Sequence, residues 1–273
     1  MQCALSVHLE SFAFSSHPAI KNLSGTEKKR LDRGCIITQT EKLLSLLSGY
    51  NVKITFFIVS LIHEWYPDLV EKIAAAGHEI AWHTHTHAAC HSQEALVREL
   101  EAARVFFAQY KPVFFCAPEF KFTDDSYNLL AEAGFQAATT GISHSAEIRH
   151  GKISEIPVSA IQNSNDDIIF SRGLSASFLI KAFPFGSSFF FPVVPVSVLI
   201  NCCKKRSIDH LASNLFFHNW QIFFESLPAF FDRMSYFFRN PFYFPYLLPC
   251  RSTLEKLLRE ISFSPCKSVY LKI

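Results

Sequence analysis

Three histidines at alternate positions, His83, His85 and His87, follow a short apolar alternation at 78–82. Imidazole is the commonest metal-binding side chain, so this segment could bind a divalent ion. In an extended chain His83 and His87 would share one side but lie roughly 13 Å apart, too far for one ion. In a helical turn they lie about 5–6 Å apart, and both can reach zinc through bonds of about 2.0–2.1 Å. We therefore expect the strand to break into a helical turn at His83, with His85 pointing elsewhere.

Two imidazoles make an incomplete site, because hydrolytic zinc typically has three protein ligands, one often a carboxylate, and a water. A candidate for the third ligand lies near the start of the chain, where His8 and Glu10 alternate with apolar neighbours and so share a face. Thr84 and Thr86 can hydrogen-bond the local backbone, which favours a turn between the two imidazoles. The opposing interpretation is that these histidines are structural or solvated.

Repeated strand-then-helix patterns must position these residues. Such alternation specifies right-handed crossovers and a parallel sheet or barrel. Ligands of such folds bind at the C-terminal ends of the strands, where the histidines fall. Ser92 is expected to cap the third helix. The pattern predicts strands at 4–7, 51–59, 78–82, 112–118 and 135–140, and helices at 40–49, 67–77, 92–107 and 125–134.

The pattern is weaker after residue 150. We expect a strand at 152–159, a strand edge and loop at 216–227, and a final amphipathic helix at 251–263 capped by Ser252 or Thr253. The aromatic and proline-rich region 178–200 fits no single pattern. No internal repeat or linker interrupts the chain, so residues 1–273 are expected to form one domain.

Composition excludes several classes of protein. With 273 residues, 49% of them apolar and 18% charged, the chain can bury a large core. A net charge of +2 with no long basic run makes nucleic acid a poor partner. The eight cysteines are scattered without a C-x-x-C pair, which indicates reduced thiols. The first residues show no secretory signal, so a cytoplasmic location is expected.

The segment 182–203 contains no charged residue and is long enough to span a membrane. Its three prolines, at 184, 192 and 195, argue against a straight helix. We expect buried strands and loops here. A membrane-surface or lipid-chain contact and a transmembrane helix are the less favoured alternatives.

Four runs of the sequence together resemble one family. They are TFFIVS, PDLVEKIAAAGHEIAWHTHTH, FFCAPEF and LLAEAGFQAATT, between residues 52 and 140. The resemblance is to the polysaccharide deacetylases, carbohydrate esterases built on an incomplete (β/α) barrel. It implies an α/β fold of this type, metal-assisted hydrolysis of an acetamide, and an N-acetylated glycan or lipid-linked sugar as the partner.

The resemblance also implies roles for individual residues. His83 and His87 correspond to the two histidines that bind a divalent metal, usually zinc, and Glu10 to the third ligand. His8 occupies the position of the catalytic base, which is normally an aspartate. Cys116 stands where an arginine normally orients that base. Imidazole is a competent substitute for the base, because it can accept a proton at neutral pH.

A later segment resembles the part of the family that supplies the general acid. His218 occupies the position of the histidine that acts as the general acid or stabilises the oxyanion, although Asn219 replaces the usual proline. A surface histidine is the alternative. Trp220 and Pro118 are the expected substrate-binding residues.

Three states of the site remain open. His8 could serve as the base, or it could join Glu10, His83 and His87 around a closed ion, or the barrel could have lost turnover. The favoured function is a metal-dependent hydrolase that removes N-acetyl groups from a polysaccharide or sugar-lipid intermediate, as in exopolysaccharide biosynthesis. The alternatives are a catalytically impaired glycan- or metal-binding relative, and a peripheral membrane or assembly component of a polysaccharide pathway.

Overall fold

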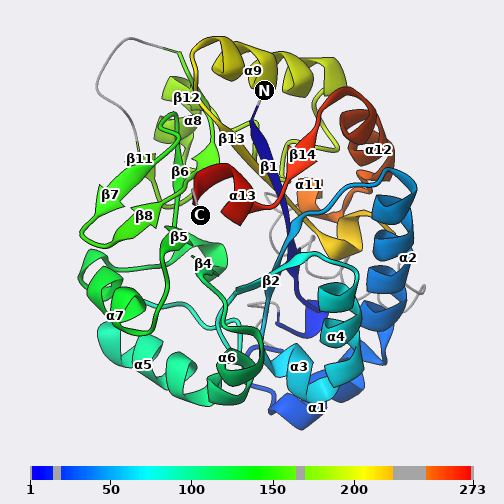
Figure 1. Ribbon diagram of the computed structural model, residues 1–273, viewed down its shortest axis with the longest axis vertical. Coiled ribbons are helices and arrows are strands. Elements are labelled where there is room, and N and C mark those ends of the chain that lie inside the picture. The colour runs from blue at the N-terminus through cyan, green and yellow to red at the C-terminus, as the bar shows by residue number, and fades with distance from the viewer. Residues whose placement is uncertain (1, 15–19, 164–169, 224–243, 272–273) are drawn as a thin grey trace.

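A curved, largely parallel sheet lies at the centre of the computed structural model, which describes residues 2–14, 20–163, 170–223 and 244–271 (Figure 1). All neighbouring strands of this sheet run parallel except its last pair. In spatial order they are β13 (Ser213–His218), β1 (Cys3–Leu9), β2 (Thr55–Ile58), β3 (Glu79–Trp82), β4 (Phe114–Cys116), β5 (Ala137–Thr139), β8 (Ile153–Glu155) and β7 (Ile148–His150), with β14 (Phe263–Ser264) also paired to β1. The described strands form an open, incomplete barrel, which confirms the expected fold class.

Helices lie around the periphery of this sheet and cover its strands (Figure 1). Because strands of a parallel sheet are covered on both faces, they are rich in apolar residues, and every residue of β1, β2, β4 and β5 is buried. The helices are α1 (Gly25–Asp32), α2 (Cys35–Gly49), α3 (Leu61–Trp65), α4 (Pro67–Ala75), α5 (Gln93–Ala102), α6 (Arg104–Tyr110), α7 (Tyr127–Glu132), α8 (Ala176–Lys181), α9 (Val196–Ile208), α11 (Phe244–Leu247), α12 (Arg251–Glu260) and α13 (Cys266–Tyr270).

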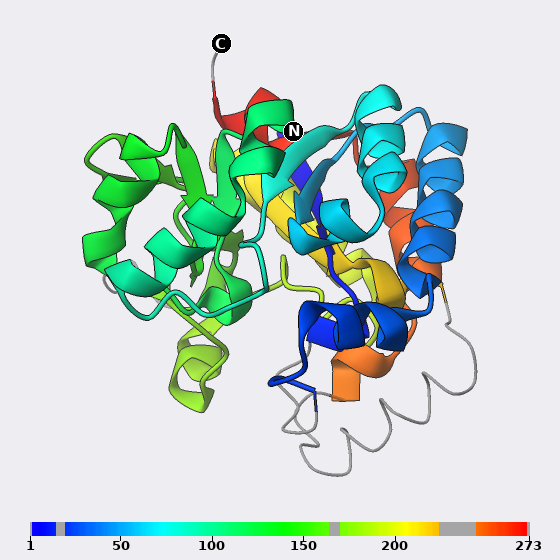
Figure 2. The ribbon, with the colours of Figure 1, turned by 90° about the horizontal axis from the view of Figure 1, so that it is seen from below.

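Short elements complete the connections. β6 (Ile142–Ser143) pairs with β9 (Val158–Ser159) and β11 (Phe170–Ser171), while β10 (Ile161–Gln162) pairs with β12 (Ala182–Phe183). The described residues include single turns of 3₁₀ helix at η1 (Phe12–Phe14), η2 (Pro118–Phe120), η3 (Asp124–Ser126) and η4 (Asn219–Gln221). Figure 2 shows β1 (blue) and β13 (yellow) crossing the centre of the fold together, although they are far apart in the sequence.

Most sequence-predicted elements are present, and the differences have local causes. Ser92 caps α5 as expected, accepting a hydrogen bond from Ala95 N. The single helix expected at 92–107 is divided at Ala103, whose φ of −85° and ψ of 5° end α5 before α6 begins. The expected strand 152–159 is interrupted at Pro157, which has no N–H to donate to a neighbouring strand.

The expected cap of the last long helix is wrong. Cys250, and neither Ser252 nor Thr253, is the residue before the first turn of α12. The Thr253 hydroxyl instead donates to Phe191 O at 3.0 Å, which ties α12 to the segment before α9.

The uncharged segment 182–203 forms a strand, then turns, then a helix. Buried strand and loop were the expectation, and this is wrong for its second half, where α9 begins at Val196. Pro195 immediately precedes α9, a position at which its missing N–H costs no helical hydrogen bond. Among the residues that the structure describes, no helix combines the length and the apolar character needed to cross a bilayer.

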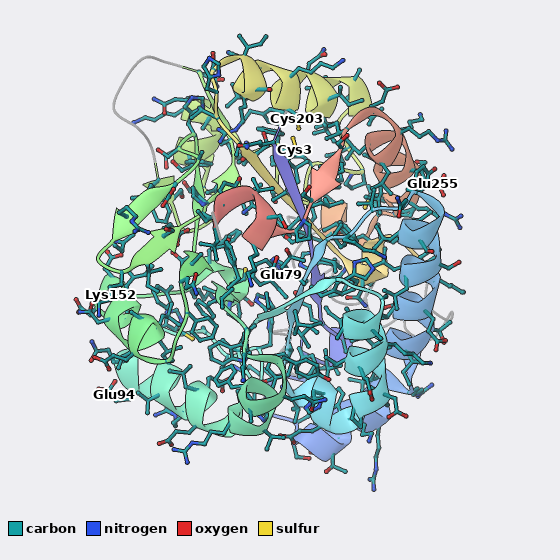
Figure 3. The ribbon with its side chains drawn as sticks, viewed as in Figure 1. Cys3, Glu79, Glu94, Lys152, Cys203 and Glu255 are labelled. Carbon is teal, nitrogen blue, oxygen red and sulfur yellow. The ribbon has the colours of Figure 1, made fainter. Side chains whose placement is uncertain are left out.

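Side chains fill the space between the sheet and the helices (Figure 3). Cys3 of β1 and Cys203 of α9 are buried in this layer and contact each other through their thiols. All eight cysteines are free thiols, in agreement with the scattered spacing in the sequence.

Candidate metal centre and active site

Four strand ends meet at one edge of the sheet. β1, β3, β4 and β13 run parallel, so the residues at or just past their C-terminal ends converge there. The β1–β13 register pairs His8 directly with His218. The sequence-predicted site residues His8, Glu10, His83, His87 and His218 are thereby brought together.

Glu10 is the centre of this group. The residue is 6% exposed, and its backbone N–H donates to Asn219 Oδ1 at 3.3 Å. Its Oε2 lies 3.0 Å from His87 Nε2, and its Oε1 lies 3.7 Å from His83 Nε2. On the opposite side, Oε1 lies 3.3 Å from His218 Nε2. One carboxylate therefore faces three imidazoles.

The turn that carries His83 and His87 differs from the expected helical turn. Thr84 and His87 adopt left-handed backbone conformations, with φ of 57° and 62°. These two residues fold the chain back directly after β3 and place the rings of His83 and His87 5.1 Å apart between centroids. The expected proximity is therefore confirmed, but a left-handed bend, and not a helix, produces it.

Glu99 of α5 holds this bend, and sequence reasoning missed it. Its carboxylate accepts hydrogen bonds from His85 N and Thr86 N, both at 2.7 Å, and from Thr86 Oγ1 at 2.8 Å. The sequence contains one signal for this role. Glu99 follows Leu96 by three residues and so lies on the inward face of the helix, where a carboxylate needs partners.

His85 points away from Glu10, as expected. Its Nδ1 lies 3.1 Å from Ser60 Oγ, which also accepts from Trp82 Nε1 at 3.2 Å. The expectation that Thr84 bonds the local backbone is wrong, because within the described part of the chain its hydroxyl has no partner.

The tautomer of His83 is fixed by a backbone carbonyl. His83 Nδ1 lies 2.8 Å from Cys116 O, and because a carbonyl only accepts, Nδ1 must carry the proton. The lone pair is then on Nε2, which faces Glu10. A second hydrogen bond of this kind is the usual way in which a metal-binding imidazole is oriented.

The charges within the cluster are coupled. Burial alone would raise the pKa of Glu10, but His87 and hydrogen bonds from the surrounding imidazoles lower it well below its usual value. Burial likewise opposes the charged form of His87, and Glu10 outweighs it, so the pKa of His87 is raised. Without a metal, the Glu10 carboxylate therefore favours a proton on His87. A dication that binds at these two residues would displace that proton.

His8 lies between Glu10 and Cys116. Its Nδ1 is 3.9 Å from Glu10 Oε1, its Nε2 is 3.5 Å from Cys116 Sγ, and its ring stacks on Phe216 at 4.4 Å. Burial, followed by the charges of His83 and His218, holds the pKa of His8 well below its usual value, so the ring is neutral. Burial also raises the pKa of the Cys116 thiol well above its ordinary value.

Gln221 orients His218, and sequence reasoning missed this residue as well. Gln221 Oε1 accepts from His218 N at 3.1 Å and lies 3.1 Å from His218 Nδ1, while its amide donates to Ser188 O. Nδ1 therefore carries a proton, and Nε2 faces Glu10. Ser188 Oγ lies 3.1 Å from the same Nδ1.

The two expected substrate-binding residues occupy different surroundings. Trp220 stacks on the His218 ring at 4.3 Å, and its Nε1 donates to Tyr246 O. Pro118 is buried at the start of η2, and its carbonyl accepts from Lys121 N at 2.9 Å. Their contact with a substrate remains a prediction.

The Glu10, His83 and His87 side chains fit a divalent metal. Tetrahedral zinc with bonds of about 2.0–2.1 Å separates its ligand atoms by about 3.3 Å. The two Glu10–histidine separations, 3.0 Å from Oε2 to His87 and 3.7 Å from Oε1 to His83, involve different carboxylate oxygens and lie on either side of that value. One carboxylate and two neutral imidazole nitrogens form a common donor set for catalytic zinc.

Glu99→Gln is expected to weaken metal binding about 10- to 100-fold, as substitution of an outer partner of a metal ligand typically does. The amide offers one acceptor where the carboxylate offers two, so the bend between His83 and His87 loosens. Titration of the chelator-treated protein with zinc measures the change. Glu101→Gln, at an exposed position of the same helix, is the control and should bind as the wild type does. Equal affinities for the two variants would refute the role of Glu99.

A family model and a curated relative match the chain. The model described as Polysaccharide deacetylase matches residues 31–138. A peptidoglycan-N-acetylglucosamine deacetylase of Bacillus cereus is 32% identical over 109 residues, which are 38% of this chain and 51% of that protein. The match thus spans about half the length of this curated relative.

Solved structures share the fold over nearly the whole chain. A structure named as a polysaccharide deacetylase of Mycobacterium smegmatis has a TM-score of 0.54 at 19% identity and covers 97% of this chain and 92% of that one. A CE4 family pseudoenzyme of Bacillus anthracis has a TM-score of 0.50 at 12% identity, with 98% and 64% coverage. At these identities the likeness concerns the fold alone.

Proposed function

Because residues 31–138 belong to the polysaccharide deacetylase family, we propose that the chain is a metal-dependent hydrolase that removes N-acetyl groups from a polysaccharide or a sugar-lipid intermediate. The observation that carries the proposal is the convergence of Glu10, His83 and His87, with His8 and His218 on either side. The B. cereus relative is named for an N-acetylglucosamine substrate, which supports an N-acetylated glycan as the substrate here.

Glu10, His83 and His87 would hold the ion through Oε1 or Oε2 and the two Nε2 atoms. A divalent metal held there would supply Lewis acidity, which would polarise the acetyl carbonyl and acidify the attacking water. His8 would take the proton of that water at Nδ1, the nitrogen that faces Glu10, while its Nε2 remains beside Cys116. The neutral state of the buried His8 ring leaves it free to accept this proton.

His218 would protonate the leaving amine. Gln221 keeps a proton on Nδ1, so a second proton can be delivered only from Nε2, the nitrogen 3.3 Å from Glu10 Oε1. Trp220 stacks on the His218 ring and limits its rotation. The base and the acid thus lie on neighbouring strands, with ring centroids 5.3 Å apart.

Acetate release from an oligomer of N-acetylglucosamine tests the proposal. Chelation should abolish release, and added zinc should restore it. His83→Ala and His87→Ala should lose most of the bound metal, whereas His91→Ala, at an exposed position outside the cluster, should keep it. If both of the first two variants retain full metal, the assignment of the ligands is wrong.

A catalytically impaired glycan- or metal-binding protein is the second candidate. The observation that favours it is the presence of His8 and Cys116 where the family resemblance leads us to expect an aspartate and an arginine. The fold is also that of a protein named as a pseudoenzyme. This candidate requires that the purified protein bind metal or glycan and release no acetate.

His8→Asp is expected to raise acetate release. The substitution restores the carboxylate that the family resemblance implies as the base at this position, and a missing base costs about 10²- to 10⁴-fold. We expect a gain of at least about tenfold in kcat/KM for the N-acetylated oligomer. His91→Asp is the matched control. A fall in rate would mean that the His8 imidazole is the better base in this site, and an unchanged rate would mean that the arginine missing at Cys116 limits the reaction.

A further inference from the structure

Cys116 introduces a sulfur donor next to the proposed metal centre. Its Sγ lies 3.5 Å from His8 Nε2, and both side chains are buried, with Cys116 0% and His8 5% exposed. Together with His83 they form a group whose candidate ligand atoms all lie within 4.8 Å of one another. This group contains neither Glu10 nor His87.

The two donor groups share a single atom. His83 Nδ1 is committed to the Cys116 carbonyl, so Nε2 is the nitrogen that His83 can offer to either group. An ion at Glu10 and His87 and an ion at His8 and Cys116 would therefore compete for the same lone pair. The first group adds a carboxylate oxygen to its nitrogens, and the second adds a thiolate. Thiolates favour soft ions, while carboxylates favour harder ones.

We propose that His8, His83 and Cys116 form an alternative, thiolate-containing position for a thiophilic divalent ion such as cadmium, occupied in competition with the position at Glu10, His83 and His87. On binding, the Cys116 S–H bond breaks, a sulfur–metal bond forms, and the proton passes to solvent. The ion's charge offsets the cost of burying the thiolate, because a coordinating thiol is deprotonated outright.

Occupation of this position has a consequence for the proposed function, on which this step of the inference rests. The imidazole lone pair of His8 would coordinate the ion, so His8 could not act as a base. Glu10 and His87 would be left without the ion they share with His83. The identity of the bound ion would therefore decide between turnover and a closed site, and thiophilic ions in excess would inhibit acetate release.

Cadmium chloride titrated into the chelator-treated full-length protein tests the assignment. A thiolate bound to cadmium gives a charge-transfer absorption in the ultraviolet that nitrogen and oxygen ligands do not give. We expect this absorption to saturate at one ion per chain and to disappear in both Cys116→Ser and Cys116→Ala. Cys203→Ala is the matched control. Cys203 is a buried thiol that contacts Cys3, so its loss should leave the absorption unchanged. Persistence of the absorption in both Cys116 variants would overturn the proposal.

His8→Gln provides a second variant that leaves the thiol in place. It should weaken cadmium binding at least tenfold and weaken manganese binding, which favours oxygen ligands, by less than about twofold. Equal losses for both ions would contradict an alternative position. Sulfur–metal absorption is independent of acetate release, so an inactive protein that gives this absorption would refute the proposed function and not this site. An active protein that lacks this absorption would refute this site and not the proposed function.

Discussion

Glu10→Gln is expected to lower kcat/KM for the proposed acetate release by about 10³-fold, since metal assistance is worth several kcal/mol and each 1.4 kcal/mol is tenfold. The reason is geometric. Glu10 is the only carboxylate within 4.0 Å of His83, His87 and His218 in the described part of the chain, so all three imidazoles lose their common partner. The amide nitrogen of glutamine would also face imidazole nitrogens. Steady-state kinetics and the zinc content of the same preparation measure the effect.

Glu119→Gln tests whether the loss of a nearby negative charge, without the loss of a proposed ligand, changes the rate. Glu119 raises the pKa of His87 by its charge alone, and its side chain is exposed and paired with Lys121 at 2.5 Å. This variant should change kcat/KM by less than about threefold, as expected for a screened surface charge. If Glu10→Gln behaves like Glu119→Gln, with metal and rate retained, the carboxylate on β1 is not a ligand and the proposed centre has to be abandoned.

The convergence of the site residues could be predicted because it follows from the alternation of side chains along a strand and from the common direction of parallel strands. His8 and Glu10 share a face by strand alternation, and the histidines follow the next-but-one strand of the same parallel sheet. Parallel strands direct their C-terminal ends to one edge, so both groups had to meet there. The position of His218 depended on the family resemblance alone, because no local pattern tells which strand will lie beside β1.

The details that orient the imidazoles could not be predicted. Glu99 and Gln221 act through hydrogen bonds whose partners are set by the tertiary fold, and the left-handed conformations of Thr84 and His87 are uncommon for residues other than glycine. A propensity-based reading of 83–87 therefore leads to a helical turn. The carboxylate of Glu99 supplies the hydrogen bonds that make the alternative bend stable.

The short basic stretch 204–206 contains both exposed and buried residues. Lys204, Lys205 and Arg206 look alike as a charged patch, but α9 exposes the two lysines and buries the arginine completely. The helical period separates them, since Arg206 follows Cys203 by three residues and lies on the same buried face. A charge with no exposed surface needs hydrogen-bond partners in the protein interior.

Arg206 ties three separate backbone segments together. Its guanidinium donates to Ala212 O from Nε at 3.2 Å and from Nη2 at 2.7 Å, and from Nη1 to Ala160 O at 3.2 Å and to His144 O. Among the described residues no carboxylate forms an ion pair with it, so these carbonyls are its direct partners, while Asp209 adds a favourable charge without an ion pair. Ala212 immediately precedes β13, the strand that carries His218.

Arg206→Met is expected to lower the free energy of unfolding by about 2–4 kcal/mol, because a buried acceptor left without a donor costs about 1–3 kcal/mol and the carbonyls of Ala212 and His144 lose theirs. Ala160 O keeps its contact with His144 Nδ1 at 3.2 Å. Removal of a buried charge returns part of this cost, which keeps the loss below the sum of the two terms. Urea unfolding at constant m-value measures the change, with Lys205→Met, exposed on the same helix, expected within about 0.5 kcal/mol of the wild type. Amide exchange should increase first in β13, since its anchor at Ala212 is lost. A stability loss with no increase in β13 exchange would show that Arg206 supports the fold without positioning His218.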